Sequence, residues 1–188
     1  MGSSPTLGTK NEYKVNLLVT GFGTFSAISD NPSAQLAKHS NSPFQVLEVS
    51  YQAVDHFLDS GEPLEYDAML FLGYAKRSFL TPELYAYNEY SPSPDVAGVI
   101  RSGTISETTP KVLNTRLWVS NLHEPIGKLD FVQISTDPGR YLCNYIYYQG
   151  LSRFPNKKIG FLHVPAFDVV PMESQLKTIS NLIQIVTV

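Results

Sequence analysis

Short apolar runs that alternate with helical patterns limit what this chain can fold into more than any other feature of its sequence. Such runs are typical of strands that a sheet buries on both faces. They cover residues 15–20, 45–50, 67–73, 131–135 and 158–164. Helical patterns follow most of them, beginning at residue 31 and covering residues 53–60, 142–151 and 173–186. The alternation predicts an α/β fold in a single domain, with a mostly parallel twisted sheet flanked by helices on both faces, an αβα sandwich.

Two of the predicted helices carry clear sequence signals. Asn31-Pro-Ser33 places Asn at the N-cap and Pro at the first helical position, and both residues are favoured there. In the last helix, Leu176, Ile179 and Ile183 fall on one face, as packing on a core requires. Residues 90–110 are instead rich in Ser, Pro, Gly and Thr, so they predict a long loop over one end of the sheet.

The composition sets the class of protein and argues against several functions. A chain of 188 residues with 43% hydrophobic and 16% charged residues fits one globular domain. We expect that domain over residues 13–188, with residues 1–12 a loose tail or a cloning remnant. The net charge of -3 leaves no basic stripe, so no nucleic-acid partner is predicted. No apolar run is long enough to span a bilayer and no secretory signal is evident, so we expect a cytoplasmic protein without a membrane partner.

The chain has a single cysteine, Cys143. It therefore cannot form a disulfide within the chain or a Cys-rich metal site. Motifs for several other chemistries are missing, since the sequence has no G-x-G-x-x-G, P-loop, G-x-S-x-G or H-E-x-x-H pattern. A single thiol in a reducing compartment is free to be either inert or reactive.

Polar and reactive residues gather where the predicted strands end. In open α/β sheets, ligands bind beyond the carboxyl ends of the strands. Residues 21–25 follow the first run, residues 74–83 the third and residues 136–143 the fourth, while His163 lies at the end of the fifth. The cysteine, a histidine and a glutamate are therefore expected at one edge of the sheet. A thiol nucleophile needs these parts, namely a base that takes its proton and a third group that holds the base.

Each of these three residues also has a purely structural interpretation. Cys143 follows the turn Asp137-Pro-Gly-Arg140, and a position near a helix N-terminus lowers the pKa of a thiol. A helix that begins at Asp137 would weaken this effect, and free cysteines are commonly buried and inert. A lone histidine in an apolar strand, such as His163, is more often a hydrogen-bonded core residue than a catalyst. Glu83 also suits the first turn of a helix, where the dipole favours a carboxylate.

Three segments resemble motifs of the pyroglutamyl peptidase I family of cysteine peptidases. They match the nucleophile, histidine and glutamate segments of that family, and they are residues 135–148 (STDPGRYLCNYIYY), 160–165 (GFLHVP) and 80–83 (LTPE). The resemblance implies that Cys143 is the nucleophile, His163 its base and Glu83 the residue that orients the base. It spans nearly the whole chain, from Val15 to the final helix.

The resemblance also implies a set of substrate contacts. Residues 19–25 are similar to the opening motif of the family, in which two aromatic residues flank the substrate ring. That role falls on Phe22 and Phe25, which taken alone would be assigned to the core. Tyr141 and Leu142, which precede the nucleophile, are implied to line the same pocket.

The implied function is a cysteine exopeptidase that removes N-terminal pyroglutamate from peptides through an acyl-enzyme, with no metal and no cofactor. Its partners would be peptides that begin with pyroglutamate, and a homo-oligomer is compatible with the sequence. Residues 73–77 (GYAKR) differ from the glycine-rich turn that is common in the family, so a relative with altered specificity or without activity is one alternative. Another is a phosphorylase-like α/β enzyme that acts on a small molecule and in which Cys143 is structural.

Overall fold

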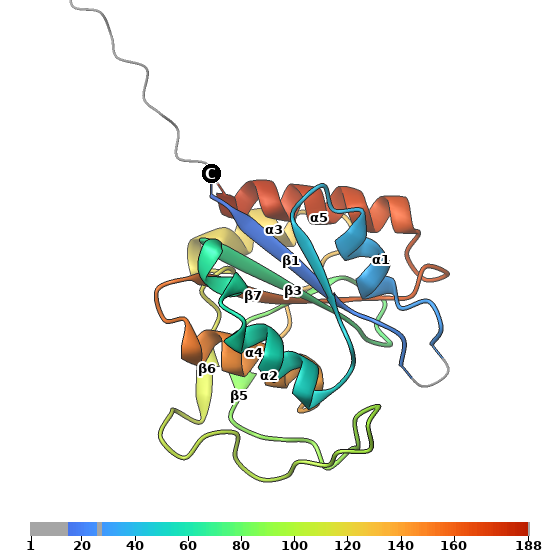
Figure 1. Ribbon diagram of the computed structural model, residues 1–188. Helices are drawn as coiled ribbons and strands as arrows, with labels where there is room; N and C mark the ends of the chain where they lie inside the picture. The colour runs from blue at the N-terminus through green and yellow to red at the C-terminus, as the bar shows by residue number, and fades with distance from the viewer. Residues whose placement is uncertain (1–14, 26–27, 188) are drawn as a thin grey trace, which may run out of the picture.

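Five strands form the central sheet of the computed structural model, which describes residues 15–25 and 28–187 (Figure 1). Their order across the sheet is β2, β1, β3, β7, β4, and all neighbours are parallel except β4, which runs antiparallel to β7. The strands are β1 (Leu17–Phe22), β2 (Phe44–Leu47), β3 (Ala68–Tyr74), β4 (Thr81–Glu83) and β7 (Lys158–Val164). The mostly parallel sheet is thus confirmed, and the tail predicted at residues 1–12 lies outside the described residues.

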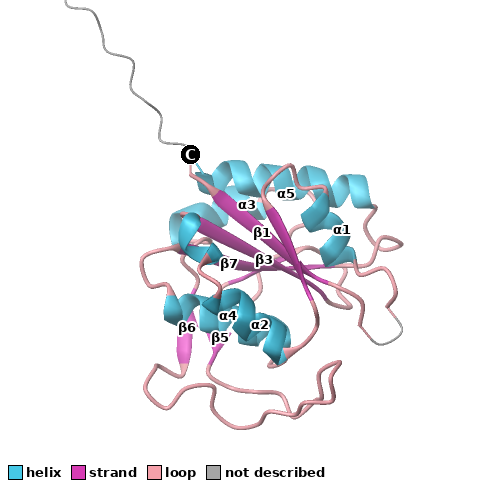
Figure 2. Ribbon diagram, in the orientation of Figure 1, coloured by secondary structure: helices cyan, strands magenta, loops and turns pink. Residues whose placement is uncertain are grey.

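Helices cover both faces of this sheet, so the αβα sandwich is confirmed (Figure 2). One face carries α1 (Pro32–Lys38), α3 (His123–Gly127) and α5 (Met172–Thr187). The other carries α2 (Tyr51–Asp59) and α4 (Leu142–Arg153). Two 3-10 turns, η1 (Glu62–Glu65) and η2 (Ser120–Leu122), and an antiparallel pair of strands, β5 (Tyr85–Tyr87) and β6 (Val112–Asn114), complete the elements.

Separate apolar clusters hold the two layers of helices, because successive residues of a strand point to opposite faces. Phe71 of β3 and Phe161 of β7 pack beneath α2 and α4, whereas Leu70 and Leu162 pack beneath α1 and α5. All four side chains are fully buried. Both strands are therefore buried on both faces, which is why their sequences are continuous apolar runs.

The turn from β1 into α1 is fixed by short polar contacts. The Asn31 side chain accepts a hydrogen bond from the Ser33 amide over 3.1 Å, and the Ser33 hydroxyl accepts one from the Phe22 amide over 3.0 Å. A Cβ on Gly21 would lie 2.2 Å from the Ser33 carbonyl oxygen, so only glycine allows the helix to begin this close to the strand. The predicted helix start at Asn31 and Pro32 is confirmed.

The prediction of a buried strand at residues 131–135 is wrong. This segment runs parallel to residues 80–84 at the edge of the sheet, and four backbone hydrogen bonds with bridges at Val132 and Ser135 join the two without a continuous strand. Phe131 is 44% exposed. The three-residue β4 offers too few partners for a regular strand, and it was not itself predicted because so short a strand gives no periodic signal.

Candidate active site

The antiparallel pairing of β4 with β7 brings Glu83 to His163. Thr81 lies opposite His163 and Glu83 lies opposite Phe161, so these four side chains share one face of the sheet. The Nδ1 of His163 donates to the Oε1 of Glu83 over 2.8 Å, and both side chains are buried. Two residues that were predicted to meet at this edge are therefore in direct contact, with Glu83 in a strand and not in the first turn of a helix.

Cys143 is the second residue of α4, and its sulfur lies over β3. A Cβ added to Gly73 would be 2.7 Å from the Cys143 Sγ, so the missing side chain of this glycine provides the space for the thiol. Gly73 is the register partner of His163 on the neighbouring strand β7, and side chains in register point to the same face. The thiol and the imidazole consequently lie on one face of the sheet, over adjacent strands.

The helix begins at Leu142 and not at Asp137, so Cys143 lies in its first turn. Burial nevertheless raises the pKa of the Cys143 thiol to about 12, and the Glu83 carboxylate adds to this effect while Arg77 opposes it. The expectation of a lowered thiol pKa is therefore wrong. Loss of hydration outweighs the stabilisation that the helix N-terminus gives to a thiolate.

Burial acts on His163 in the opposite direction. It lowers the pKa of the imidazole, and the hydrogen bond to Glu83 raises that pKa again without cancelling the effect. At neutral pH the site therefore contains a neutral thiol and a neutral imidazole. Because Nδ1 donates to Glu83, the remaining ring nitrogen, Nε2, is the one that can accept a proton.

Arg77 connects Glu83 with the segment that leads to the thiol. Its Nη1 lies 2.9 Å from the Glu83 Oε1 and donates to the Ser135 hydroxyl over 2.9 Å, while Nη2 donates to the Asp137 carbonyl oxygen over 2.7 Å. The second carboxylate oxygen of Glu83 has no hydrogen-bond partner among the described residues. The charge of this carboxylate is thus balanced by Arg77, whereas the neutral imidazole of His163 donates a hydrogen bond to it. The sequence placed Arg77 in an altered turn and gave it no role.

A small pocket of about 70 Å³ opens beside the thiol. Cys143 lines it together with all four predicted substrate contacts, namely Phe22, Phe25, Tyr141 and Leu142. The rings of Phe25 and Tyr141 contact each other at a tilt of 44°, with their centroids 5.8 Å apart. Phe22 is only 4% exposed and packs in the apolar core. It is therefore both a core residue and a part of the pocket wall.

Four further residues that were not predicted to bind substrate complete the pocket, and they are Ile28, Asn31, Val49 and Tyr74. Asn31 was marked as a helix cap and as part of the segment that resembles the opening motif of the family, but not as a substrate contact, and Tyr74 only as the residue after a strand. Nothing in the sequence marks Ile28 or Val49, because the fold alone brings them to this wall. No charged side chain is found among the described residues that line the pocket. A neutral, largely apolar group therefore fits it best.

Metal ligands and membrane spans were also considered. In the part of the chain that the structure describes, no group of three or more His, Cys, Asp and Glu side chains could hold a metal ion. Within residues 15–25 and 28–187, none of the helices is long and apolar enough to cross a membrane.

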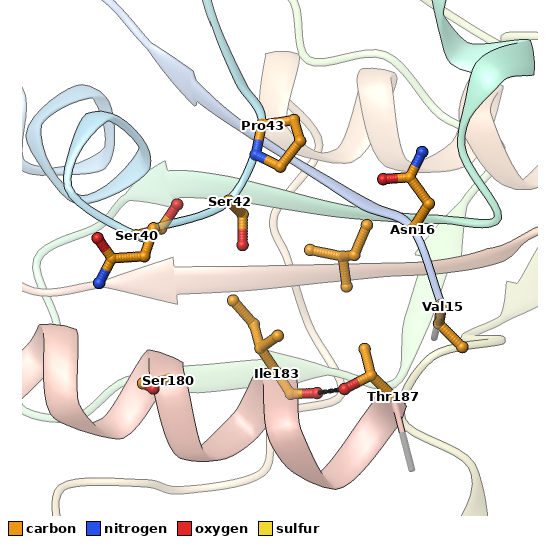
Figure 3. A pocket seen from close by; sticks show the side chains of 10 residues that line it. Val15, Asn16, Ser40, Ser42, Pro43, Ser180, Ile183 and Thr187 are labelled. Carbon is orange, nitrogen blue, oxygen red and sulfur yellow. Dashed lines mark hydrogen bonds between the residues drawn. The ribbon is translucent and has the colours of Figure 1, made fainter. Parts of the chain in front are cut away.

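A larger hollow of about 420 Å³ lies at the other end of β1 (Figure 3). The start of β1, the loop after α1 and the last turns of α5 line it, with Asn16, Ser42 and Ser180 among the side chains. The Thr187 hydroxyl at its rim donates to the Ile183 carbonyl oxygen over 2.8 Å. None of the described residues that line this hollow carries a titratable side chain.

Comparison with known proteins agrees with this geometry. The family model for pyroglutamyl peptidase matches residues 15–181. The chain is 30% identical to a pyrrolidone-carboxylate peptidase of Streptococcus pneumoniae, over 80% of this chain and 78% of that protein. It is 28% identical to a pyrrolidone-carboxylate peptidase of Lactobacillus acidophilus, over 80% of this chain and 84% of that protein. The solved structure of the pyrrolidone carboxyl peptidase from Thermococcus litoralis superimposes with a TM-score of 0.81 at 26% identity, covering 92% of this chain and 93% of the other. The chain therefore belongs to the pyroglutamyl peptidase family.

Proposed function

We propose that this chain is a cysteine exopeptidase that removes N-terminal pyroglutamate from peptides, with Cys143 as nucleophile, His163 as base and Glu83 as the residue that orients the base. The observation that carries the proposal is the position of the thiol. It lies over Gly73, on the same face of the sheet as the His163–Glu83 pair, and it lines an uncharged pocket. Membership of the pyroglutamyl peptidase family supports the substrate class.

The first half of the reaction acylates the thiol. As Cys143 Sγ attacks the carbonyl carbon that follows the pyroglutamyl ring, its proton passes to Nε2 of His163. Because the resting pair is neutral, proton transfer accompanies the attack and no preformed ion pair is needed. The first intrahelical bond of α4 runs from the Tyr145 amide to the Tyr141 carbonyl, so the amides of residues 142–144 precede it and are suited to stabilise the oxyanion.

The second half of the reaction releases both products. The imidazolium of His163 gives its proton to the leaving nitrogen, the C–N bond breaks, and a thioester of Cys143 remains. The neutral imidazole then takes a proton from water, whose oxygen attacks the thioester and releases pyroglutamate and the thiol. Glu83 holds the ring in the orientation required for both steps and stabilises its charged form.

The neutral walls of the pocket account for the preference for a lactam. A free N-terminal amine is charged at neutral pH, and burying it without a partner costs several kcal/mol. A pyroglutamyl ring carries no such charge, and its methylene groups suit the apolar wall that Phe25 and Tyr141 form together. Proline is the sharper test, because its ring is of similar shape but its nitrogen is cationic and it has no lactam oxygen.

The test is kcat/KM on matched pyroglutamyl, prolyl and glutaminyl substrates that carry the same fluorogenic leaving group. We expect the pyroglutamyl substrate to be favoured by about 10³-fold or more, because the other two leave polar groups of the site unpaired. Comparable rates on all three would identify a general aminopeptidase. No hydrolysis of any of them, together with retention of function after alkylation of Cys143, would favour an enzyme in which the thiol is structural.

The physiological setting is also a proposal. A free cysteine that functions as a thiol fits the reducing cytoplasm, and peptides that begin with pyroglutamate are the proposed partners. The altered turn at residues 73–77 keeps a relative of changed specificity as the second candidate, since Arg77 at the end of that turn contacts Glu83 directly. The absence of a nucleic-acid partner and the oligomeric state stay predictions from the sequence.

A further inference from the structure

The long loop between β5 and β6 runs below α2 and α4 in the view of Figure 1, and two hydrogen bonds join it to the wall of the pocket beside the thiol. The Tyr141 hydroxyl donates to the Pro94 carbonyl oxygen over 2.8 Å, and the Val96 amide donates to the Val49 carbonyl oxygen over 3.2 Å. Tyr141 and Val49 both line the pocket. The conformation of the loop therefore fixes the position of two wall residues.

Arg101 fastens this loop to the two helices. Its Cζ lies 4.7 Å from the ring centroid of Tyr51, 5.3 Å from that of Tyr145 and 6.0 Å from that of Tyr90. Its Nη2 donates to the Asp55 carboxylate over 2.9 Å, and its Nη1 donates to the Tyr145 hydroxyl over 2.8 Å. One guanidinium thus joins a residue of the loop to α2 and α4 through stacking and charge-assisted hydrogen bonds.

Tyr51 links this contact to the segment that touches the pocket wall. Its amide, at the start of α2, donates to the Asp95 Oδ2 over 2.9 Å. Asp95 is 6% exposed, and its other oxygen accepts the Val99 amide over 2.8 Å, which closes a tight turn in the loop. Asp95 directly follows Pro94, whose carbonyl oxygen accepts the hydrogen bond from Tyr141. The start of α2, on which Arg101 stacks, therefore also holds the loop next to Pro94.

We propose that Arg101 is a positioning residue for the pocket. It holds the loop on α2 and α4 so that the Pro94 carbonyl keeps Tyr141 in the pocket wall, with its ring in contact with that of Phe25. Arg101 is not one of the residues that line the pocket, and it acts through Tyr141. The identity of the bound ring rests on the proposed function, whereas the shape of the pocket does not.

Arg101→Ala tests this role against a matched control, Arg153→Ala. Arg153 resembles Arg101 in two respects, since it also pairs with Asp55, at 3.7 Å, and its side chain is 30% exposed against 32% for Arg101. Its ion pairs, however, connect α4 with α2 and do not involve the loop. We expect Arg101→Ala to raise KM for a pyroglutamyl substrate about 3- to 10-fold, the range of one net hydrogen bond, with kcat nearly unchanged. Arg101→Lys should restore part of the loss, because it keeps the charge but not the planar fork. Arg153→Ala should leave KM as in the wild type.

Two further measurements separate positioning from general stabilisation. In a Tyr141→Phe background, which lacks the hydroxyl, Arg101→Ala should have little further effect on KM. Iodoacetamide should label Cys143 faster in Arg101→Ala than in the wild type, and this experiment needs no substrate. The labelling rate therefore distinguishes the two proposals. If no substrate is hydrolysed but Arg101→Ala is labelled faster than the wild type, the proposed function is contradicted and the role of Arg101 is not. A lowered Tm with wild-type KM and wild-type labelling rate, or full additivity with Tyr141→Phe, would overturn the role of Arg101.

Discussion

Two hollows lie at opposite ends of β1, and the smaller one holds the reactive group. The pocket at the carboxyl ends of β1 and β3 encloses about 70 Å³, whereas the hollow at the amino ends of β1 and β2 encloses about 420 Å³ (Figure 3). Cys143 lines the first, and no described residue around the second is titratable. The proposed nucleophile therefore lies where the fold predicts a ligand site, at the carboxyl ends of the strands, although the hollow there is the smaller of the two.

The direction of the helices explains this difference. At the carboxyl ends of the strands α1 and α4 begin, so their positive dipole ends lie near the pocket, and the amides of residues 142–144 precede the first intrahelical bond of α4. At the amino ends α1 and α5 end, and nearby hydroxyls bind their last carbonyl groups. Ser40 donates to the Ala37 carbonyl oxygen over 2.8 Å, and Thr187 donates to that of Ile183 over 2.8 Å. Two hydroxyl groups of the larger hollow, those of Ser40 and Thr187, thus complete helix ends.

Loss of the thiol is the strongest test of the contrast between the two hollows. Cys143→Ala is expected to lower kcat on a fluorogenic pyroglutamyl substrate by at least about 10⁴-fold, because the nucleophile is gone. The fold should persist, since a methyl group replaces a thiol. Ser42→Ala, a change of similar size in the larger hollow, is the control and should keep wild-type kinetics. Activity retained by Cys143→Ala would remove Cys143 from the mechanism.

Glu83 and Arg77 should shift the pH profile in opposite directions. The reaction needs neutral His163, so the acidic limb of kcat/KM follows the pKa of this imidazole. Burial lowers that pKa, the Glu83 carboxylate raises it and the Arg77 charge lowers it. Glu83→Gln should therefore move the limb to lower pH and reduce kcat about 10²-fold, while Arg77→Gln should move it to higher pH. Shifts of both variants in one direction would show that this pair does not set the pKa of His163.

A methyl group on Gly73 should displace the thiol. The new Cβ would lie 2.7 Å from Cys143 Sγ and 2.6 Å from the Phe161 ring, and neither the helix nor the core can easily move away. We expect kcat/KM to fall by up to about 10²-fold, the effect of a misplacement of about 1 Å. Gly127→Ala is the control, since a Cβ there meets no atom within 4 Å. Wild-type kinetics in Gly73→Ala would mean that the sulfur has room elsewhere.

The aromatic wall should contribute to binding and less to the chemical step. Phe25→Ala removes one side of the pocket and should raise KM about 10- to 200-fold, which corresponds to roughly 1–3 kcal/mol. Phe44→Ala is the matched control, because Phe44 is 46% exposed at the start of β2, at the other end of the sheet. An unchanged KM together with a lowered Tm would make Phe25 a structural residue only.

Burial explains which parts of the fold could be predicted from the sequence. Residues 158–164 were predicted with their observed bounds, because a strand covered on both faces is a continuous apolar run between polar flanks. The run at residues 131–135 has the same character but lies at the sheet edge, and its exposed Phe131 cannot be told from a buried one by composition. The short strands β4, β5 and β6 form through tertiary pairing and carry no pattern of their own.

The candidate site, like the fold, has features that could be predicted from the sequence and features that could not. Cys143, His163 and Glu83 could be placed at one edge because strand ends and local motifs mark them, and the structure brings the last two into contact. The contact of Arg77 with Glu83 could not be predicted, since it depends on a side chain that reaches from a turn to a segment distant in the sequence. The raised pKa of the Cys143 thiol could not either, because burial is a property of the folded chain.

The smallest expected effect is a change in the larger hollow. Ser180→Leu would place an apolar side chain among its polar lining residues, on the exposed side of α5. We expect kcat/KM to stay within about twofold of the wild type, as for most surface substitutions, and Tm to change little, because Leu is a good helix former. The six-residue β1 separates this position from the pocket by about 20 Å, and neither Ser180 nor the leucine that replaces it carries a charge that could act across that distance. A changed KM in Ser180→Leu would show that the two ends of the sheet are coupled. The larger hollow would then be a site that controls binding in the pocket beside Cys143, and not an inert one.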